Sequence, residues 1–285
     1  MSLGPGSEAL VVPTVDANGL AIPAIGMGTW RLSGADGQRA VETALEVGYR
    51  HIDTAEIYGN EREVGAAIAA SGIRRDELFV TTKAWHDHIG AGDLQRAAEA
   101  SLERLGLAHA DLYLIHWPNP DIPLGQSLEA LADVKARGLA RAVGVSNFPA
   151  LLLEEAIRLS PVPLALNQVE MHPYLAQSAV MDVAHRNGLA VTAYCPIARN
   201  TVAEDPVVVA IAEAHGKTPA QVALRWLIQK GGVIAIPKSS HRKRLIENLD
   251  VFDFELTTGE AAAIDGLSRS DGRIVDPDFA PSWDR

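Results

Sequence analysis

Four reactive side chains stand at or near the ends of β-rich segments in this sequence. Asp53 lies inside the segment 51–55, and Tyr58 follows that segment. Lys83 and His116 end two further β-rich runs. A buried charge costs free energy unless it is paired, so we expect Asp53 and Lys83, on adjacent strands, to be each other's partner.

These four residue types could together transfer a proton to a substrate oxygen. A lysine ammonium beside a phenol favours the phenolate, so Lys83 is expected to lower the pKa of Tyr58 from about 10 toward neutrality. Tyr58 is then a candidate general acid, and His116 could orient the substrate oxygen against it. Each residue alone has a structural explanation: a loop cap for Asp53, packing for Tyr58, a solvated strand end for Lys83 and a hydrogen-bonded core histidine for His116.

Short β-rich runs alternate with amphipathic stretches along the chain of 285 residues. Strands are expected at 25–29, 51–55, 79–83, 112–116, 142–145, 164–169, 190–194 and 233–237. Helices are expected at 37–47, 62–71, 93–105, 128–137, 151–159, 177–186, 207–214, 219–229, 242–249 and 260–267. A hairpin of 11–15 and 20–22, turning at Asn18-Gly19, precedes them.

The pattern predicts an α/β fold, a (β/α)8 TIM barrel with an N-terminal β-hairpin and extra C-terminal helices. Runs such as Val233-Ile234-Ala235-Ile236 are continuously apolar, which favours a parallel sheet covered on both faces. A doubly wound sheet is disfavoured because the stretch 25–31 lacks the third glycine of a phosphate loop. We expect one domain over 8–285, after a leader or tag remnant over 1–7.

Composition excludes some classes of partner. The net charge of −11, from 36 acidic and 25 basic residues, argues against nucleic-acid and membrane-surface binding. The one cysteine, Cys195, excludes an internal disulfide framework and suits a reducing cytoplasm. His86 and His88 lack nearby cysteines or paired carboxylates, so no metal site is expected.

A basic cluster follows the last predicted strand. Lys238, Ser239 and Ser240 precede the helix 242–249, which begins with three cations. Backbone amides at a helix start and flexible cations can bind an anion. Arg242 and Lys243 could equally belong to a solvated helix face.

Several motifs, in order along the chain, resemble those of the aldo-keto reductase family. They are Gly48-Tyr49-Arg50-His51-Ile52-Asp53-Thr54-Ala55 with Tyr58 and Asn60-Glu61, Leu114-Ile115-His116-Trp117-Pro118, Gly144-Val145-Ser146-Asn147-Phe148, Asn167-Gln168-Val169-Glu170 and Ile236-Pro237-Lys238-Ser239. The resemblance runs from about residue 22 to the C-terminus and is closest to the bacterial 2,5-diketo-D-gluconate reductase B group. It implies carbonyl reduction by NADPH, with Asp53, Tyr58, Lys83 and His116 as the catalytic tetrad.

The resemblance also implies where NADPH/NADP+ would bind. The expected cofactor residues are Gly28, Thr29, Trp30, Asp53, Ser146, Asn147, Gln168, Tyr194, Cys195, Pro196, Ile197, Lys238, Ser239, Ser240, Arg244 and Asn248. Lys238, Arg244 and their neighbours would surround the 2′-phosphate and adenine, and Tyr194 would stack on the nicotinamide. Cys195 stands where serine is frequent, and the loop 197–205 is short, so we expect cofactor exchange to be comparatively unhindered.

The expected substrate is a small reactive carbonyl, such as methylglyoxal, because the resembled group reduces small dicarbonyls and aldehydes. Trp30, Tyr58, Trp85, His116 and Trp117 are the expected substrate-binding residues. A monomer is expected from the family. Two alternatives remain: a cofactor-binding regulatory or redox-sensing barrel with little turnover, and a barrel lyase or hydrolase using paired carboxylates.

Overall fold

Eight parallel strands form a closed barrel in the computed structural model, which describes residues 12–284. The strands are β3 (Met27–Gly28), β4 (His51–Asp53), β5 (Phe79–Ala84), β6 (Ala110–Ile115), β7 (Ala140–Ser146), β8 (Leu166–Glu170), β9 (Ala190–Tyr194) and β10 (Val233–Ala235), hydrogen-bonded in that order. Closure is made beside β3, where Ile25 forms a parallel bridge with Ala235. The predicted TIM barrel is confirmed.

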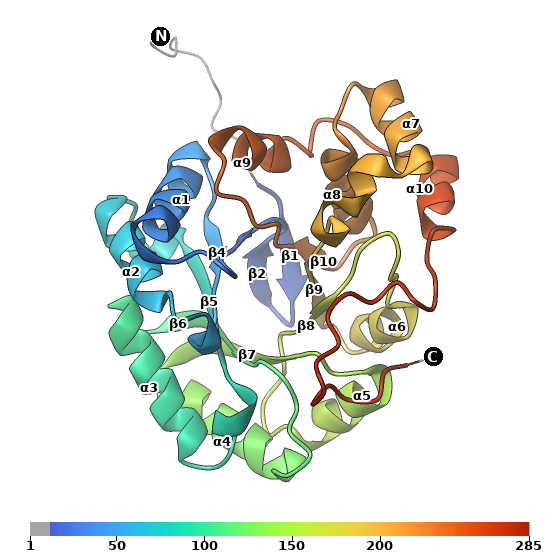
Figure 1. Cartoon of the computed structure of the whole chain (residues 1–285). Helices are drawn as coiled ribbons and strands as arrows, with labels where there is room; N and C mark the ends of the chain where they lie inside the picture. Colours follow the sequence, from blue (N-terminus) through green and yellow to red (C-terminus); the bar gives the residue numbers. More distant parts are fainter. Residues whose placement is uncertain (1–11, 285) are drawn as a thin grey trace.

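Helices surround the strands as an outer ring (Figure 1). They are α1 (Gly34–Val47), α2 (Glu61–Ala70), α3 (Asp93–Leu105), α4 (Leu124–Ala136), α5 (Ala150–Leu159), α6 (Ser178–Arg186), α7 (Pro206–His215), α8 (Pro219–Gln229), α9 (Arg242–Leu249) and α10 (Thr258–Asp265). Side-chain caps fix several starts: the Asp205 carboxylate accepts the amides of Val207 and Val208 at the start of α7. No helix within residues 12–284 is long and apolar enough to cross a bilayer.

Several predicted boundaries were wrong. α4 begins at Leu124, ahead of the predicted residue 128, because Pro123 at its N-cap favours a helix start before the apolar pattern becomes visible. The strands β3 and β10 are shorter than the predicted 25–29 and 233–237. The backbone still pairs beyond them, since Thr29 N donates to Asp53 O at 3.0 Å.

Short 3-10 helices between the main elements were not predicted. They are η1 (Glu56–Tyr58), η2 (Arg75–Glu77), η3 (His86–His88) and η4 (Ala198–Glu204). One helical turn contains too few residues for a hydrophobic period, so the sequence pattern gives no signal for it. η1 carries Tyr58, so this class of element matters to the site.

A β-hairpin closes the N-terminal end of the barrel. It consists of β1 (Thr14–Ala17) and β2 (Leu20–Pro23), joined by Asn18 and Gly19 with φ of 52° and 83°. Two residues of positive φ match a tight hairpin turn. The first strand begins later than the predicted 11–15, and residue 11, like the predicted leader over 1–7, lies outside the described residues.

Alternation along the strands decides which side chains enter the barrel. On β6, Leu112 and Leu114 belong to the inner cluster that also holds the hairpin residue Ile22, whereas Tyr113 and Ile115 pack in the layer between strands and helices. Because side chains on a strand alternate between faces, the same rule places Asp53 and Lys83 inside the barrel. Both lie at the carboxyl ends of their strands, where barrel enzymes place their chemistry.

Candidate active site

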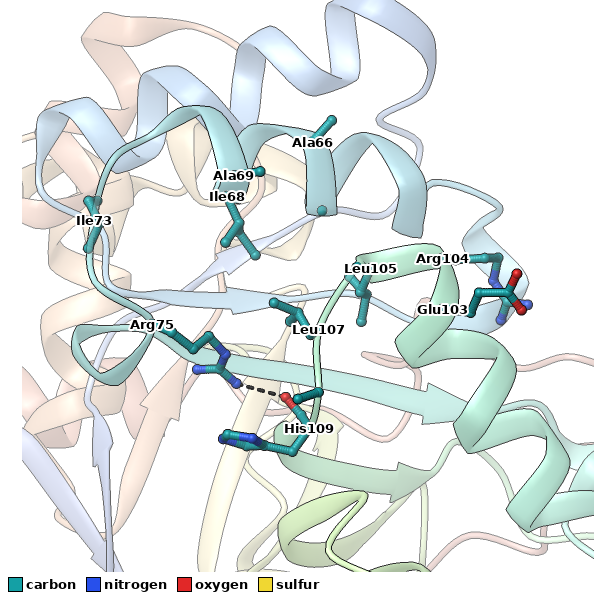
Figure 2. A pocket seen from close by; sticks show the side chains of 13 residues that line it. Ala66, Ile68, Ala69, Ile73, Arg75, Glu103, Arg104, Leu105, Leu107 and His109 are labelled. Atoms are coloured by element: carbon teal, nitrogen blue, oxygen red, sulfur yellow. Dashed lines mark hydrogen bonds between the residues drawn. The ribbon is translucent and has the colours of Figure 1, made fainter.

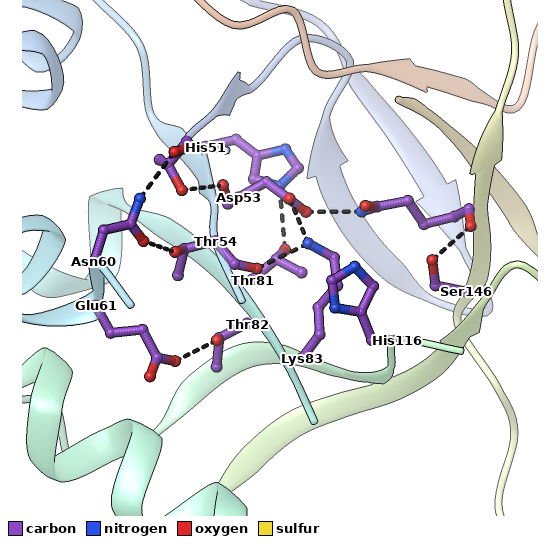
Figure 3. Close-up of polar contacts among 12 residues, drawn as sticks. His51, Asp53, Thr54, Asn60, Glu61, Thr81, Thr82, Lys83, His116 and Ser146 are labelled. Atoms are coloured by element: carbon purple, nitrogen blue, oxygen red, sulfur yellow. Dashed lines mark hydrogen bonds and ion pairs between the residues drawn. The ribbon is translucent and has the colours of Figure 1, made fainter. Parts of the chain in front are cut away.

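A buried ion pair forms the centre of the site (Figure 3). Lys83 Nζ donates to Asp53 Oδ1 at 2.6 Å and to Thr54 O at 2.8 Å. Gln168 Nε2 donates to the other carboxylate oxygen, Asp53 Oδ2, at 2.7 Å. Asp53 and Lys83 are 1% and 0% exposed, so each charge depends on these contacts instead of water. The predicted pairing is confirmed.

Asn60 holds the loop that follows β4. Its Nδ2 donates to Thr29 O and Leu32 O, both at 2.8 Å, and its Oδ1 accepts from Thr54 Oγ1 at 2.8 Å. These bonds join the loop after β4 to the loop after β3 (Figure 3). The turn that carries Tyr58 is therefore fixed at its C-terminal end by a buried amide.

The Tyr58 ring lies close to the ion pair and to His116. Its ring centroid is 5.4 Å from Lys83 Nζ and 5.6 Å from the His116 ring. Burial, and next the negative charge of Asp53, raise the pKa of Tyr58 well above its ordinary value. The predicted lowering of this pKa was wrong for the described structure, because burial of the phenol raises it most and the negative charge of Asp53 raises it further. The phenol is protonated at neutral pH and can donate a proton.

His116 follows β6 and faces Tyr58. It is 8% exposed, and its Nδ1 has no hydrogen-bond partner among residues 12–284. Burial lowers the pKa of His116 well below its ordinary value, and the positive charge of Lys83 acts in the same direction. The imidazole is therefore neutral near pH 7, a protonation state that the sequence left open.

Ser146, Asn147 and Gln168 form a network beside the ion pair. Ser146 Oγ donates to Gln168 O at 2.7 Å, and Asn147 Nδ2 donates to His116 O at 2.9 Å. Tyr194 OH donates to Asn147 Oδ1 at 2.8 Å. These bonds already occupy several of the groups that are expected to bind a carboxamide. They also hold His116 and Tyr194 in place.

Cys195 follows Tyr194 in a backbone conformation that favours glycine, with φ of 50°. Burial raises the pKa of the Cys195 thiol to about 11. The group is therefore a thiol at neutral pH and is a poor nucleophile. Pro196 and Ile197 continue from it into η4.

Unpaired cations lie at the end of β10 and on α9. Arg242 pairs with Glu46 at 2.7 Å, and Lys243 lies 3.7 Å from Glu247. Lys238 and Arg244 form no ion pair within residues 12–284. This contrast agrees with the sequence-based preference for Lys238 and Arg244 as anion ligands.

The surroundings of these cations are preorganised. Ser239 Oγ accepts from His241 N at 3.1 Å, just before α9. Ser240 is exposed and Asn248 is buried beside this segment. A Cβ at Gly28 would lie 2.9 Å from Ile236 O, so only glycine lets the ends of β3 and β10 approach this closely.

The loop after β9 reaches the loop after β3. Trp30 is 41% exposed, and the guanidinium carbons of Arg31 and Arg199 lie 4.3 and 5.8 Å from its ring centroid. Arg199 belongs to η4. The loop 197–205 is short, yet it spans this distance.

Aromatic side chains gather beside His116 of the tetrad. The Trp85 ring centroid is 5.3 Å from that of His116 and 5.5 Å from that of Phe279, and Trp117 is 5.6 Å from Phe279. Trp85 and Trp117 therefore come together as predicted. Trp30, expected in the same mouth, makes none of these aromatic contacts.

Phe279 and Trp283 were missed by the sequence reasoning. Phe279 stacks on His86 with 4.3 Å between centroids, and Trp283 lies 5.9 Å from Trp117. Two aromatic residues in a tail without a regular pattern were the available signal. Within the described residues, no group of three potential metal ligands is present.

An open groove of about 570 Å³ lies elsewhere, between α2 and α3 (Figure 2). Ile68, Leu105, Leu107 and His109 are among the residues that line it, and no tetrad residue is. Arg75 reaches across it to donate to His109 O at 2.9 Å. This groove lies apart from the centre of charged and aromatic groups described above.

The fold and site define a (β/α)8 barrel protein with an Asp-Tyr-Lys-His set at the carboxyl ends of its strands. The model of the aldo/keto reductase family matches residues 24–269, and the chain belongs to that family. An aldo-keto reductase of Mycolicibacterium smegmatis is 48% identical over 275 residues, which are 96% of each chain.

Solved structures agree with this membership. A crystal structure named as that of "a putative 2,5-diketo-D-gluconic acid reductase B" superposes with a TM-score of 0.95 at 47% identity, over 97% of this chain and 99% of that one. A Bombyx mori aldo-keto reductase in complex with NADP superposes with a TM-score of 0.87 at 36% identity, over 95% and 99%.

Proposed function

We propose that this protein reduces small aldehydes, ketones or dicarbonyls to alcohols with NADPH, and that Tyr58 is the general acid. The observation that carries the proposal is the buried Lys83–Asp53 pair at 2.6 Å, with protonated Tyr58 and neutral His116 beside it. Methylglyoxal and 2,5-diketo-D-gluconate are representative substrates. A cytoplasmic monomer is part of the same proposal.

The residues present fit a phosphorylated nicotinamide cofactor. Lys238 and Arg244 are cations that form no ion pair within residues 12–284, next to the start of α9, and Gly28 leaves room where β3 meets β10. Tyr194 and the amides of Asn147 and Gln168 lie toward the tetrad. The cofactor, when bound, supplies the hydride. The relative named as an NADP complex supports the choice of NADP(H).

The chain's own groups provide the proton. Tyr58 OH donates it to the carbonyl oxygen as that oxygen gains negative charge. The Lys83 ammonium, held by Asp53, stabilises the phenolate left behind, and neutral His116 offers a hydrogen bond to the same oxygen. Burial of the ion pair strengthens these electrostatic effects because water is excluded.

The intact tetrad favours catalysis over the regulatory alternative and over a carboxylate-based lyase or hydrolase. Glu56, the second acid in that alternative, instead accepts the Trp85 amide at 3.0 Å and lies 2.7 Å from His88 Nδ1. Its carboxylate is therefore engaged in holding the loop after β5.

NADPH absorbance at neutral pH tests the proposal. Wild type should oxidise NADPH with methylglyoxal, 2,5-diketo-D-gluconate or 4-nitrobenzaldehyde, and Tyr58→Phe should lower kcat by about 10²–10⁴-fold because the proton donor is lost. The variant should still bind NADPH, and the quenching of tryptophan fluorescence on addition of NADPH measures this binding. No turnover by wild type despite NADPH binding would favour a regulatory barrel, and full turnover by Tyr58→Phe would exclude the assigned acid.

A further inference from the structure

We propose that Glu170 is a positioning residue that docks the C-terminal strap, residues 268–284, over the substrate side of the site. The function of this residue rests on the proposed carbonyl reduction, whereas the docking itself does not. Glu170 ends β8 and is 0% exposed. The proton-transfer scheme above gives this buried acid no role.

Three donors satisfy the Glu170 carboxylate. Its Oε1 accepts from Ile274 N at 2.6 Å, and its Oε2 accepts from Val275 N at 2.8 Å. His172 Nε2 lies 2.9 Å from Oε1. Two of the three donors are thus backbone amides of the strap, and no lysine or arginine between residues 12 and 284 forms an ion pair with this carboxylate. A buried carboxylate needs such donors, so the strap and Glu170 depend on each other.

The segment after β8 also holds the beginning of the strap. Arg269 N donates to Tyr174 O at 3.2 Å. A Cβ at Gly272 would lie 1.9 Å from the same oxygen, so the strap passes against this backbone where only glycine fits. Glu170 and Tyr174 together place the strap against the end of one barrel strand.

Beyond Val275 the strap reaches the aromatic mouth. Phe279 stacks on His86 and lies edge-on to Trp85, which contacts His116 of the tetrad. Trp283 Nε1 donates to Asp276 Oδ1 at 2.8 Å, and Asp284 Oδ2 accepts from Ala150 N at 2.7 Å at the start of α5. Figure 1 shows the strap as the red segment that runs from α10 past α6 to α5.

No helix or strand follows α10 in the described residues, so no ladder of backbone bonds fixes this segment. Its position depends on a few point contacts, and Glu170 supplies two of them from inside the barrel. Loss of these bonds should free the strap while leaving the tetrad intact. The expected consequence is weaker carbonyl binding with little effect on cofactor binding.

Two variants remove the contact from opposite sides. Glu170→Gln keeps the size of the side chain, but its amide nitrogen cannot accept a backbone N–H. Val275→Pro removes one donor from the strap without changing the barrel strand. Glu61→Gln is the matched control, because Glu61 is another buried glutamate, bonded to Thr82 and Arg104 away from the strap.

Limited trypsin digestion of the full chain measures docking without reference to activity. We expect cleavage after Arg269 or Arg273, detected by intact mass, to be about 10-fold faster in Glu170→Gln and Val275→Pro, as for loss of one charge-assisted contact. Glu61→Gln should match wild type. Equal cleavage in all four proteins overturns the proposal, and Val275→Pro alone decides it if Glu170→Gln fails to fold.

Kinetics then separate docking from a merely structural role. In Glu170→Gln and in Val275→Pro the KM for 4-nitrobenzaldehyde should rise about 10-fold, while the NADPH dissociation constant stays within about twofold of the wild-type value. Weakened NADPH binding with an unchanged carbonyl KM overturns the assignment of the strap to the substrate side. If wild type shows no turnover, the proposed function fails, and faster cleavage still supports docking by Glu170.

Discussion

Two buried acids end strands on opposite sides of the same barrel, Asp53 on β4 and Glu170 on β8, and the protein satisfies them in different ways. Asp53 accepts one hydrogen bond from the Lys83 ammonium, which balances its charge, and one from the Gln168 amide. Both donors belong to barrel strands. Glu170 receives two backbone amides from an irregular tail and one histidine nitrogen. The first arrangement fixes a charge beside the proposed proton donor, and the second holds an irregular segment in place.

The difference teaches how to read charged residues in this chain. A charge matched by another charge inside the barrel sets the electrostatics of the site. A charge matched by backbone amides sets a position. A charge that has no ion-pair partner in the described part of the chain, as for Lys238 and Arg244, is available to a ligand.

The largest expected effect comes from removing the cation at the centre. Lys83→Met leaves Asp53 buried with Gln168 as its remaining donor, so the free energy of unfolding should fall by about 3–5 kcal/mol. The kcat should fall by about 10²–10⁴-fold, since nothing then stabilises the phenolate of Tyr58. Urea unfolding and NADPH absorbance measure the two effects.

The double variant Asp53→Asn with Lys83→Met is its control. Removing both charges should recover most of the stability but none of the activity. The contrast between the two acids fails if Glu170→Gln costs as much stability as Lys83→Met does.

A smaller effect is expected at the unpaired cations. Lys238→Ala and Arg244→Ala should each raise the KM for NADPH by roughly 10–100-fold, from loss of a charge-assisted bond of about 1.5–3 kcal/mol. The KM for NADH, which lacks the 2′-phosphate, should change little. Arg242→Ala, whose guanidinium already pairs with Glu46, is the control and should have no such preference. Equal effects on both cofactors would refute the assignment.

A last expected effect is on stability alone and concerns the response of the folded protein to acid. Burial lowers the pKa of His51 to about 4, below its unfolded value of about 6.5. Between these values the unfolded chain binds more protons, so stability falls as the pH drops from 6.5 to 4, by about 1.4 kcal/mol per pH unit for this group. His51→Gln should flatten the slope by that amount, and the exposed His185→Gln should not. Urea midpoints across this range provide the measurement.

The sequence predicted the barrel, and the meeting of Asp53, Tyr58, Lys83 and His116 near the strand ends, because both depend on local patterns. Apolar runs and strand ends carry the positions of Asp53, Lys83 and His116 directly. The shift in the pKa of Tyr58 was predicted in the wrong direction, because it depends on the burial of the phenol and then on its distance from the Asp53 charge. Those are three-dimensional quantities.

The strap shows the other limit of sequence reasoning. Phe279 and Trp283 lie in a tail with no period, so their contacts with Trp85 and Trp117 have no local signal. The dual role of Gln168, as donor to Asp53 and as an expected cofactor ligand, likewise required the distance between strands far apart in the sequence. Long-range contacts between irregular segments remain outside such patterns.

The N-terminal hairpin makes the two ends of the barrel different, because it covers one of them. Figure 1 shows β1 and β2 lying across the interior of the ring of helices. Asn18 ties the hairpin to two loops at that end, through bonds to Gly188 O at 3.0 Å and Leu164 O at 2.6 Å. Because the hairpin covers this end, we expect substrate and cofactor to enter at the opposite end of the barrel, beside Asp53 and Lys83, so that the order in which the two bind and leave is coupled.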